Sequence, residues 1–273
     1  MVRSLWSAAT GMIAQQTNVD TISNNLANVN TAGYKTEVAE FKSLLYQNLQ
    51  TKTTSANGSQ KPISAQVGLG VRNSSITSVF TEGSFYESSS ASAFAIDGEG
   101  FFGVRTASGE TQYTRNGNFN WAVGNNGTLN LTTSDGLQVL DTTGKAISIP
   151  SDYKTSEVTI TADGQLCYPD ESNNPQPMGI TIGLFQFQNP AGLEKTSNSL
   201  YKATAASGQA INEATTTMSI QKSSVVQGYI EGSNVQVVDE MVNLIVAQRA
   251  YEMNSKVIQA SDDMMGQANQ LRS

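Results

Sequence analysis

The ends and the middle of this chain carry different sequence periods, and this contrast limits the folds open to it. Apolar residues recur at heptad spacing over residues 4–29 and again over residues 235–271. Between these segments the sequence changes to short alternating runs separated by glycine-containing turns. Heptad spacing is typical of helices that pack on other helices, and short alternation is typical of β-hairpins. We therefore expect an α+β fold, with two long terminal helices and a mainly β centre.

The first heptad segment predicts a helix whose apolar stripe needs a partner. One row consists of Leu5, Met12, Val19 and Leu26, and a second of Ala8, Gln15, Ile22 and Val29. A stripe this narrow does not hold an isolated helix in water. The helix is expected to end near residues 30–33, where Gly33 suits a left-handed C-terminal cap. Trp6 lies off the stripe: it is either an unpacked residue of a fraying end or an anchor in a pocket between subunits, and we favour the anchor.

The C-terminal segment predicts a longer helix with more than one contact face. Its apolar rows are Val237, Leu244, Tyr251, Ile258 and Met265, and Ala250, Val257, Met264 and Leu271. A further row is small or polar and lets a partner helix approach closely: Ala247, Asn254, Ser261 and Ala268. Asn234 is expected to cap the start of the helix. Two apolar rows on one helix predict contact with several neighbours, so we expect the discontinuous terminal helices to form a coiled-coil layer around the β centre.

The remaining segments complete the expected organisation. Residues 34–46 are expected to form a second, short helix, and the polar residues 50–66 a loop or hairpin tip. From residue 68 to about residue 217, Asp-Gly and Asn-Gly pairs such as Asp97-Gly98 separate the short strands and predict a hairpin-rich β domain. The predicted domains are residues 1–45 together with 228–273 for assembly, 46–69 as a polar linker, and 70–227 as the central β domain.

Composition excludes several classes of function. The chain has no histidine, which removes Ser-His-Asp and Cys-His nucleophilic sites, HExxH zinc sites and histidine-ligated haem. A single cysteine, Cys167, excludes an internal disulfide, and its predicted strand has no basic neighbour that would activate a thiol. A net charge of −7 argues against binding to nucleic acid or to an anionic membrane surface. We expect no cofactor, no metal ion and no membrane insertion.

Several short motifs match known functional sites in residue type but lack the structural context that those sites require. Residues Gly98–Gly103 fit the G-x-G-x-x-G pattern, but a dinucleotide site needs a helix that starts inside the motif, and a strand and turn follow here. We expect these glycines to serve close β packing, with Phe101 and Phe102 on opposite faces of the sheet. The acid pair Asp262-Asp263 points in two directions on a helix and is expected to be solvated. The acids near residue 170 lack the spacing of a calcium loop.

Three segments carry a resemblance to a known family. They are SLWSAATGMIAQQTNVDTISNNLANVNTAGYK, then FAIDGEGFFGV followed by YTRNGNF, and GYIEGSNVQVVDEMVNLIVAQRAYEMNSKVIQASDDMM. In this order they resemble the signatures of the bacterial flagellar rod and hook family. The SLW opening, the LLYQNL segment, the polar insert before QVGLGV and the chain length are most similar to the distal rod branch. A proximal rod or hook-basal paralogue is the alternative within the family, and the stretch 121–168 does not match clearly.

The resemblance implies a building block of the flagellar basal body. It implies a helical homopolymer that serves as drive shaft and export channel, with terminal helices inside and the β domain outside. Implied partners are neighbouring rod and hook proteins, the flagellar type III export apparatus and bushing-ring proteins, at a location in the cell envelope or periplasm. The N-terminal sequence has no apolar run of signal-peptide length, so we expect export without a cleaved signal. The expected assembly residues are Leu5, Trp6, Met12, Val19, Ile22, Leu26, Val237, Leu244, Tyr251, Ile258 and Met265.

Two other functions stay open from the residues alone. A secreted binding module would recruit a cell-wall or ring partner through its β surface, between about residues 80 and 220. A polysaccharide-cleaving enzyme would need two carboxyl groups about 5 to 9 Å apart. Asp97, Glu99 and Glu110 supply acids in the β region, but no spacing in the sequence places them together.

Overall fold

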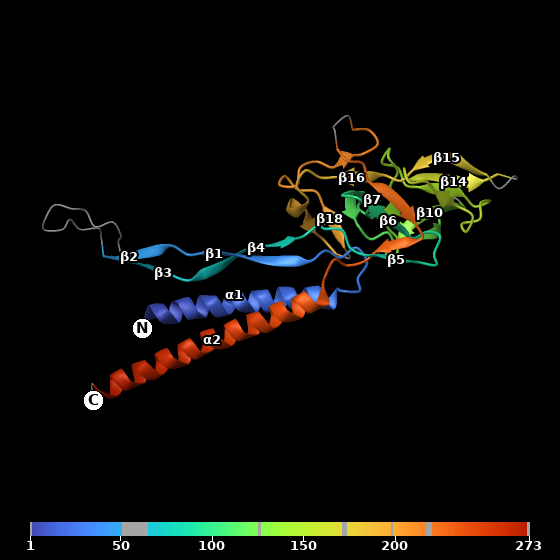
Figure 1. Ribbon diagram of the computed structural model, residues 1–273. Helices are drawn as coiled ribbons and strands as arrows, with labels where there is room; N and C mark the ends of the chain where they lie inside the picture. The colour runs from blue at the N-terminus through green and yellow to red at the C-terminus, as the bar shows by residue number, and fades with distance from the viewer. Residues whose placement is uncertain are drawn as a thin grey trace. The chain divides into compact units, whose positions relative to one another are not determined.

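A computed structural model of the chain confirms an α+β fold with terminal helices and a mainly β centre (Figure 1). It describes residues 2–50, 65–124, 127–170, 174–197, 199–216 and 220–271. Contacts divide the chain into two compact units. The first consists of residues 1–27, 37–77 and 236–273, and the second of residues 28–36 and 78–235. The domains predicted from the sequence (residues 1–45 with 228–273, 46–69 and 70–227) describe the chain within an assembly, and they stay a prediction.

The first unit contains both long helices, α1 (Val2–Ala27) and α2 (Val237–Gln270). The C-terminal end of α1 and the N-terminal start of α2 both differ from the prediction. Gly33 does have a left-handed backbone, with φ of +69°, but it lies beyond the end of α1 and does not cap it. Asn234 does not cap α2, whose N-cap residue is Gln236. The Asn234 side chain is already engaged, because its Oδ1 accepts hydrogen bonds from the N–H and Oγ1 of Thr36 at 2.8 and 2.7 Å.

Four strands accompany the helices in the first unit, and they replace the short helix expected over residues 34–46. They are β1 (Glu37–Ser43), β2 (Tyr46–Gln50), β3 (Ala65–Gly68) and β4 (Val71–Ser78). β1 pairs with β4, and β2 pairs antiparallel with β3. Along β1 half-buried and exposed residues alternate up to Lys42, which is a strand pattern. The sequence did not predict this strand, because its Glu, Ala and Lys residues favour a helix. Pairing with a distant strand outweighs such local propensity. The predicted loop over residues 50–66 lies almost entirely outside the described residues.

The second unit is a β structure built around one large antiparallel sheet. The order in this sheet is β12 (Ser148–Pro150), β10 (Thr128–Thr133), β11 (Gln138–Val139), β7 (Phe101–Arg105), β8 (Thr111–Thr114), β18 (Leu200–Lys202) and β17 (Glu194–Lys195). Attached to it are β9 (Phe119–Val123), β16 (Leu184–Gln186) and β19 (Ile211–Asn212). Four of its pairings join consecutive strands as hairpins, as the sequence predicted: β7–β8, β9–β10, β10–β11 and β17–β18. The other pairings join strands that are farther apart in the chain.

Smaller sheets and one short helix complete the second unit. They are β13 (Thr159–Ile160), β14 (Gln165–Pro169) and β15 (Pro175–Thr181); β20 (Ser224–Gln227) with β6 (Phe94–Asp97); β21 (Tyr229–Glu231) with β5 (Phe85–Glu87); and the 3-10 helix η1 (Pro190–Gly192). Phe102 belongs to the main apolar core and Phe101 to a second cluster with Tyr113, Phe187 and Tyr201. The two phenylalanines therefore face opposite sides of β7, as their alternation predicted.

Candidate assembly surface

The two helices of the first unit meet along a seam of small and polar residues. Ser4 Oγ lies 3.4 Å from Ser261 Oγ at one end, and Asn25 Nδ2 donates a hydrogen bond of 3.3 Å to Glu240 Oε1 at the other. Between them, Gly11 faces Asn254. Residue numbers rise along one helix as they fall along the other, so the pair is antiparallel (Figure 1). The close approach expected along the small-residue row of α2 is confirmed.

The seam is tight, although it is poor in apolar groups. A Cβ atom on Gly11 would lie 2.8 Å from Asn254 Nδ2, so a larger residue there would displace the Asn254 side chain. The same register places Ala247 opposite Asn18, and the Ala247 side chain is only 1% exposed. Hydrophobic stabilisation scales with the apolar area removed from water. A seam of Ser, Gly, Asn and Ala therefore fixes how the helices fit together while adding little to the stability of the pair.

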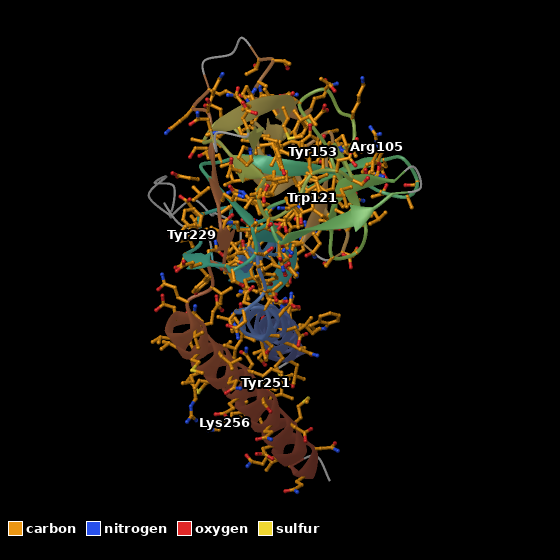
Figure 2. The ribbon with its side chains drawn as sticks, turned by 90° about the vertical axis from the view of Figure 1, so that its right-hand side faces the viewer. Arg105, Trp121, Tyr153, Tyr229, Tyr251 and Lys256 are labelled. Atoms are coloured by element: carbon orange, nitrogen blue, oxygen red, sulfur yellow. The ribbon has the colours of Figure 1, made fainter. Side chains whose placement is uncertain are left out.

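Most of the predicted assembly residues flank this seam rather than fill it. Ile22 is buried, and Trp6 has an exposed fraction of 66%. Tyr251 is also exposed and extends from α2 (Figure 2). The other predicted residues are half-buried: Leu5, Met12, Val19, Leu26, Val237, Leu244, Ile258 and Met265. Within one chain, all of these side chains except that of Ile22 are therefore partly open to a further partner, and their role in assembly stays a prediction.

The first third of α2 carries an apolar surface that the heptad search missed. Val238, Met241, Val242, Ile245 and Val246 have exposed fractions between 49% and 73%. They lie on the sides of the helix away from the seam, while Asp239 and Asn243 supply an exposed polar sector of the same part of α2. Apolar side chains over this much of a helix surface are normally buried against a partner. The run VVDEMVNLIV is the sequence feature that could have revealed this surface. We call Val238, Met241, Val242, Ile245 and Val246 the outer apolar patch.

Asn25 joins three elements of the first unit. Its Oδ1 accepts a hydrogen bond from the Glu37 N–H at 2.9 Å, and its Nδ2 donates to the Glu37 carbonyl at 2.8 Å as well as to Glu240. The side chain is buried, so these bonds are made away from water. Asn25 thereby fixes the end of α1 against the start of β1 and against the first turn of α2. Glu240 is buried in the same place, and the loss of water raises the pKa of its carboxyl, with nearby Asp239 adding to the shift.

Replacing Glu240 with glutamine is expected to strengthen the helix pair at neutral pH. Because the pKa of Glu240 is raised in the folded state, its contribution favours folding below the unfolded pKa and is lost as pH rises through the folded pKa. Glutamine keeps an acceptor for Asn25 and carries no charge. The far-ultraviolet circular dichroism signal of the monomer should therefore be more helical at pH 7 in Glu240→Gln than in the wild type, and similar at pH 4. A less helical variant at pH 7 would contradict this assignment.

Three buried charges meet in the second unit, each from a different sequence motif. Lys35 ends NTAGYK, Arg115 lies in YTRNGNF, and Glu231 lies in GYIEG. Lys35 Nζ donates to Glu231 Oε1 at 2.5 Å, and Arg115 Nη1 to Glu231 Oε2 at 3.2 Å. All three side chains are at most 2% exposed. Sequence reasoning missed this cluster, although charged residues inside otherwise polar and glycine-rich motifs were its visible sign.

Further hydrogen bonds hold these charged groups, although the buried Arg115 Nε has no hydrogen-bond partner among the described residues. Lys35 Nζ also donates to the Thr81 carbonyl at 2.6 Å, and Arg115 Nη2 to the Gly98 carbonyl at 2.7 Å. The Gly83 N–H donates to Glu231 Oε1 at 3.1 Å. The guanidinium carbon of Arg115 lies 5.2 Å from the centre of the Phe101 ring, close enough for a cation–π contact. Burial lowers the pKa of Lys35, and the Glu231 carboxylate opposes that shift.

Gly33 lies beside this cluster and tolerates no side chain. An added Cβ would lie 2.5 Å from the backbone nitrogen of Asn116, and the backbone φ is +69°. Gly33→Ala is therefore expected to cost more than about 2 kcal/mol in the free energy of unfolding of the second unit. Gly109→Ala is the matched control, since Gly109 has φ of +84° with no atom within 4 Å of the added Cβ. It should cost about 1–2 kcal/mol, from the left-handed backbone alone. Equal losses in thermal unfolding would exclude the close contact at Gly33.

The other motifs have structural explanations or remain isolated. Gly98–Gly103 lead into strand β7, so the helix that a dinucleotide site requires does not follow. Cys167 is buried, and Asp262 and Asp263 are exposed on α2. Within the described residues no three His, Cys, Asp or Glu side chains are grouped to hold a metal ion. Nor is any described helix long and apolar enough to cross a bilayer.

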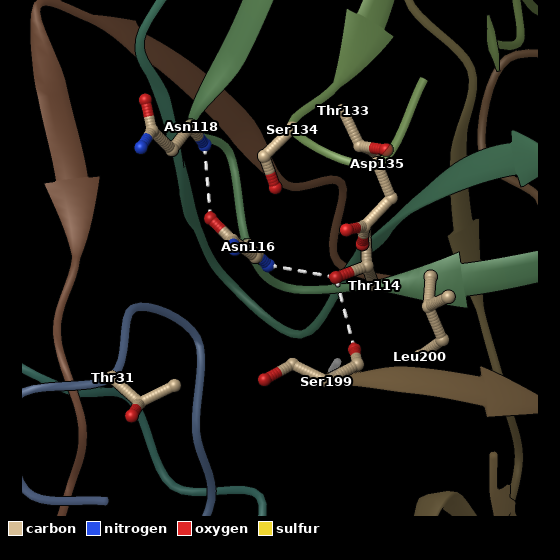
Figure 3. Close-up of a pocket in the computed structure, with 9 residues that line it drawn as sticks. All are labelled: Thr31, Thr114, Asn116, Asn118, Thr133, Ser134, Asp135, Ser199 and Leu200. Atoms are coloured by element: carbon tan, nitrogen blue, oxygen red, sulfur yellow. Dashed lines mark hydrogen bonds between the residues drawn. The ribbon is translucent and has the colours of Figure 1, made fainter. Parts of the chain in front are cut away.

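One hollow in the second unit is small and polar. It measures about 260 Å³ and is lined mainly by hydroxyl and amide side chains (Figure 3). Its groups are largely engaged with each other: Thr114 Oγ1 donates to the Ser199 carbonyl at 3.0 Å and accepts from the Asn116 N–H at 3.0 Å. Asn116 Oδ1 accepts from the Asn118 N–H at 3.0 Å. These bonds shape the loop and leave no convergent acid–base pair.

Comparison with known proteins accounts for both the helices and the β centre. Three family models match: flagella basal body rod protein over residues 5–35, flagellar hook protein FlgE/F/G D1 domain over 95–168, and flagellar basal body rod FlgEFG protein C-terminal over 226–271. The flagellar basal-body rod protein FlgG of Borreliella burgdorferi is 42% identical over 100% of this chain and 99% of its own length. The chain belongs to the FlgG family of flagellar basal-body rod proteins. It is accordingly a structural protein of the flagellar basal body.

Other relatives place the chain within this family. FlgG of Bacillus subtilis is 36% identical over 97% of both chains. The flagellar hook-basal body complex protein FlhP of the same organism is 32% identical over 100% of both chains. The similarity to FlgG proteins is thus higher than to this hook-basal paralogue, as expected from the distal rod features of the sequence. The buried Lys35, Arg115 and Glu231 lie within the three matched segments.

Proposed function

We propose that this FlgG-family chain forms the distal part of the rod, where copies of it assemble into a helical tube that transmits rotation and encloses the export channel. The observation that carries this proposal is the outer apolar patch on α2. Nothing in the described part of a single chain covers these five side chains. Leaving them in water forfeits the free energy that burial of apolar area provides.

A second copy of the same chain is the partner that fits this surface best. The half-buried rows that include Leu244 and Ile258 continue the apolar surface from the patch towards the C-terminal end of α2. Further along, the outer side of α2 becomes polar, with an ion pair of 2.9 Å between Arg249 and Glu252 and with Lys256 extending from the helix (Figure 2). A contact that repeats head to tail without closing produces a filament rather than a ring. The predicted assembly residues, from Leu5 to Met265, belong to this proposed interface.

The remaining parts of the proposal follow from the family. We propose that the terminal helices form coiled-coil inner layers, with residues 70–227 as the outer domain and 46–69 as the linker. Neighbouring rod and hook proteins, the export apparatus and ring proteins are the proposed partners. Export proceeds without a cleaved signal, and the site of action is the basal body within the cell envelope. We further propose that the chain has no enzymatic activity.

Isolation of the rod tests the function directly. Hook-basal bodies are purified after detergent and high-salt washing, and the chain is measured by quantitative mass spectrometry. A rod subunit should remain at many copies per particle, and cells lacking it should have no hook. A recruited binding module would be present in few copies or would be removed by salt, and its loss would leave the rod and hook in place. That second outcome would overturn the proposal.

A further inference from the structure

The buried charge cluster of the second unit holds two cations and one carboxylate, so Glu231 is the residue on which the cluster depends most. Glu231 alone pairs with both Lys35 and Arg115. Loss of the Lys35 charge would leave one carboxylate facing one guanidinium, a balanced pair. Loss of the Glu231 charge would leave two buried cations facing each other, offset only in part by the nearby but exposed carboxylate of Glu82. Breaking a buried pair in this way is strongly destabilising.

The two chain segments that meet at Glu231 also share hydrogen bonds that involve the backbone. The Gly33 N–H donates to the Glu231 carbonyl at 2.9 Å, and the Thr36 N–H donates to Asn234 Oδ1 at 2.8 Å. Residues 228–235 are fixed in turn to the segment after β4, since the Gly232 N–H donates to the Ser84 carbonyl at 2.8 Å. Much of what holds residues 28–36 in the second unit is therefore supplied by residues 228–235.

We propose that Glu231 is an interlock between the two ends of the chain: residues 28–36 stay ordered in the second unit only while residues 228–235 are in place, and the reverse. Residues 28–36 continue directly from α1, and residues 228–235 lead directly into α2. Loosening of one end therefore loosens the connection of the other. Such coupling between two segments is reciprocal by thermodynamic linkage. It operates within a single chain and does not depend on polymerisation.

Hydrogen exchange measured by mass spectrometry on the full-length monomer tests the interlock. The variants are Glu231→Gln, Lys35→Met and the double variant Lys35→Met/Glu231→Gln. The matched control is Lys154→Met/Glu157→Gln, which removes an exposed ion pair of 3.1 Å in the same unit. Peptides covering residues 28–36 and 228–235 report exchange in the two segments, and a peptide covering residues 79–87 reports exchange in the segment that both of them contact. Peptides from β7 and β10 report exchange in the core.

In Glu231→Gln, exchange should accelerate about a hundredfold in residues 28–36 as well as in 228–235, while the core peptides keep their wild-type rates. Adding Lys35→Met to this variant should slow exchange again, because it removes one of the two unpaired cations. The control pair should change none of these rates by more than about twofold. Acceleration confined to residues 228–235, or a double variant whose effects simply multiply, would overturn the proposal.

A second comparison keeps the proposal testable if Glu231→Gln does not fold. Lys35→Met retains the Glu231–Arg115 pair and removes only the contact from the N-terminal segment. Reciprocal coupling requires that this change accelerate exchange in residues 228–235 by about tenfold, far from the substituted residue in sequence. Wild-type rates in residues 228–235 of Lys35→Met would show that the two ends are ordered independently, and the interlock would be rejected.

Discussion

Cells whose only copy of this chain carries Ile245→Glu are expected to be non-motile and to have no hooks, although the purified variant folds as the wild type does. Ile245 lies in the middle of the outer apolar patch and is 57% exposed in the single chain. Within one chain the new carboxylate stays in water and lies one turn before Arg249, a favourable helical spacing. In an assembled interface the same charge would be buried without a partner, at a cost on the order of 3–5 kcal/mol for each contact.

The control for this substitution is Gln259→Glu. Gln259 lies on the same row of α2, two heptads further on, where the outer surface is polar and exposed. It adds the same charge outside the proposed interface and should leave swimming in soft agar unchanged. Motility equal to wild type in Ile245→Glu would show that this face of α2 is not buried in the rod. Loss of motility in both variants would point to a general intolerance of added charge.

Replacing Ala247 with leucine is expected to separate the helix pair and to block assembly as well. Ala247 is 1% exposed in the seam between α1 and α2, so the larger side chain forces the helices apart at a cost of about 1–3 kcal/mol. The expected results are reduced helical circular dichroism in the monomer and no hooks in cells.

Ala268→Leu provides the matched control, because it makes the same substitution on the same row. In the register of the seam Ala268 lies beyond the first residue of α1, so it has no residue of α1 opposite it, and it is exposed. The monomer should keep its helical signal. If Ala247→Leu and Ala268→Leu behave alike, the antiparallel seam is not the contact that orders the terminal helices.

The sequence predicted the elements of this fold better than it predicted their contacts. Heptads predict helices because the period of apolar residues matches the helix, and turn glycines predict hairpins because of their left-handed backbone. Gly98, Gly136 and Gly164, for example, all have positive φ. Neither pattern shows which row of a helix meets a partner from the same chain. On α2 that row is the small, polar one of Ala247, and the apolar rows flank it or face outward.

The errors came from contacts between residues far apart in the chain. Residues 34–46 contain good helix formers, yet β1 pairs with β4, whose sequence lies well beyond the following loop. Asn234 is a good capping residue by type, but Thr36 takes its side-chain oxygen. The polar residues of the three family motifs received no role from the sequence. Asn25, Lys35 and Glu231 make buried contacts within one chain, and a local pattern does not show which partners they meet.

The most direct measurement places a photo-crosslinking amino acid at Val242, in the outer apolar patch, within flagellated cells. Val242 is 55% exposed in the single chain, so the probe does not disturb its fold. After irradiation, basal bodies are isolated and the crosslinked products are identified by mass spectrometry. If copies of this chain cover the patch, the products are dimers and higher multiples of the chain, joined at α2. Products that join Val242 only to a different protein, or no product in intact rods, would contradict the account.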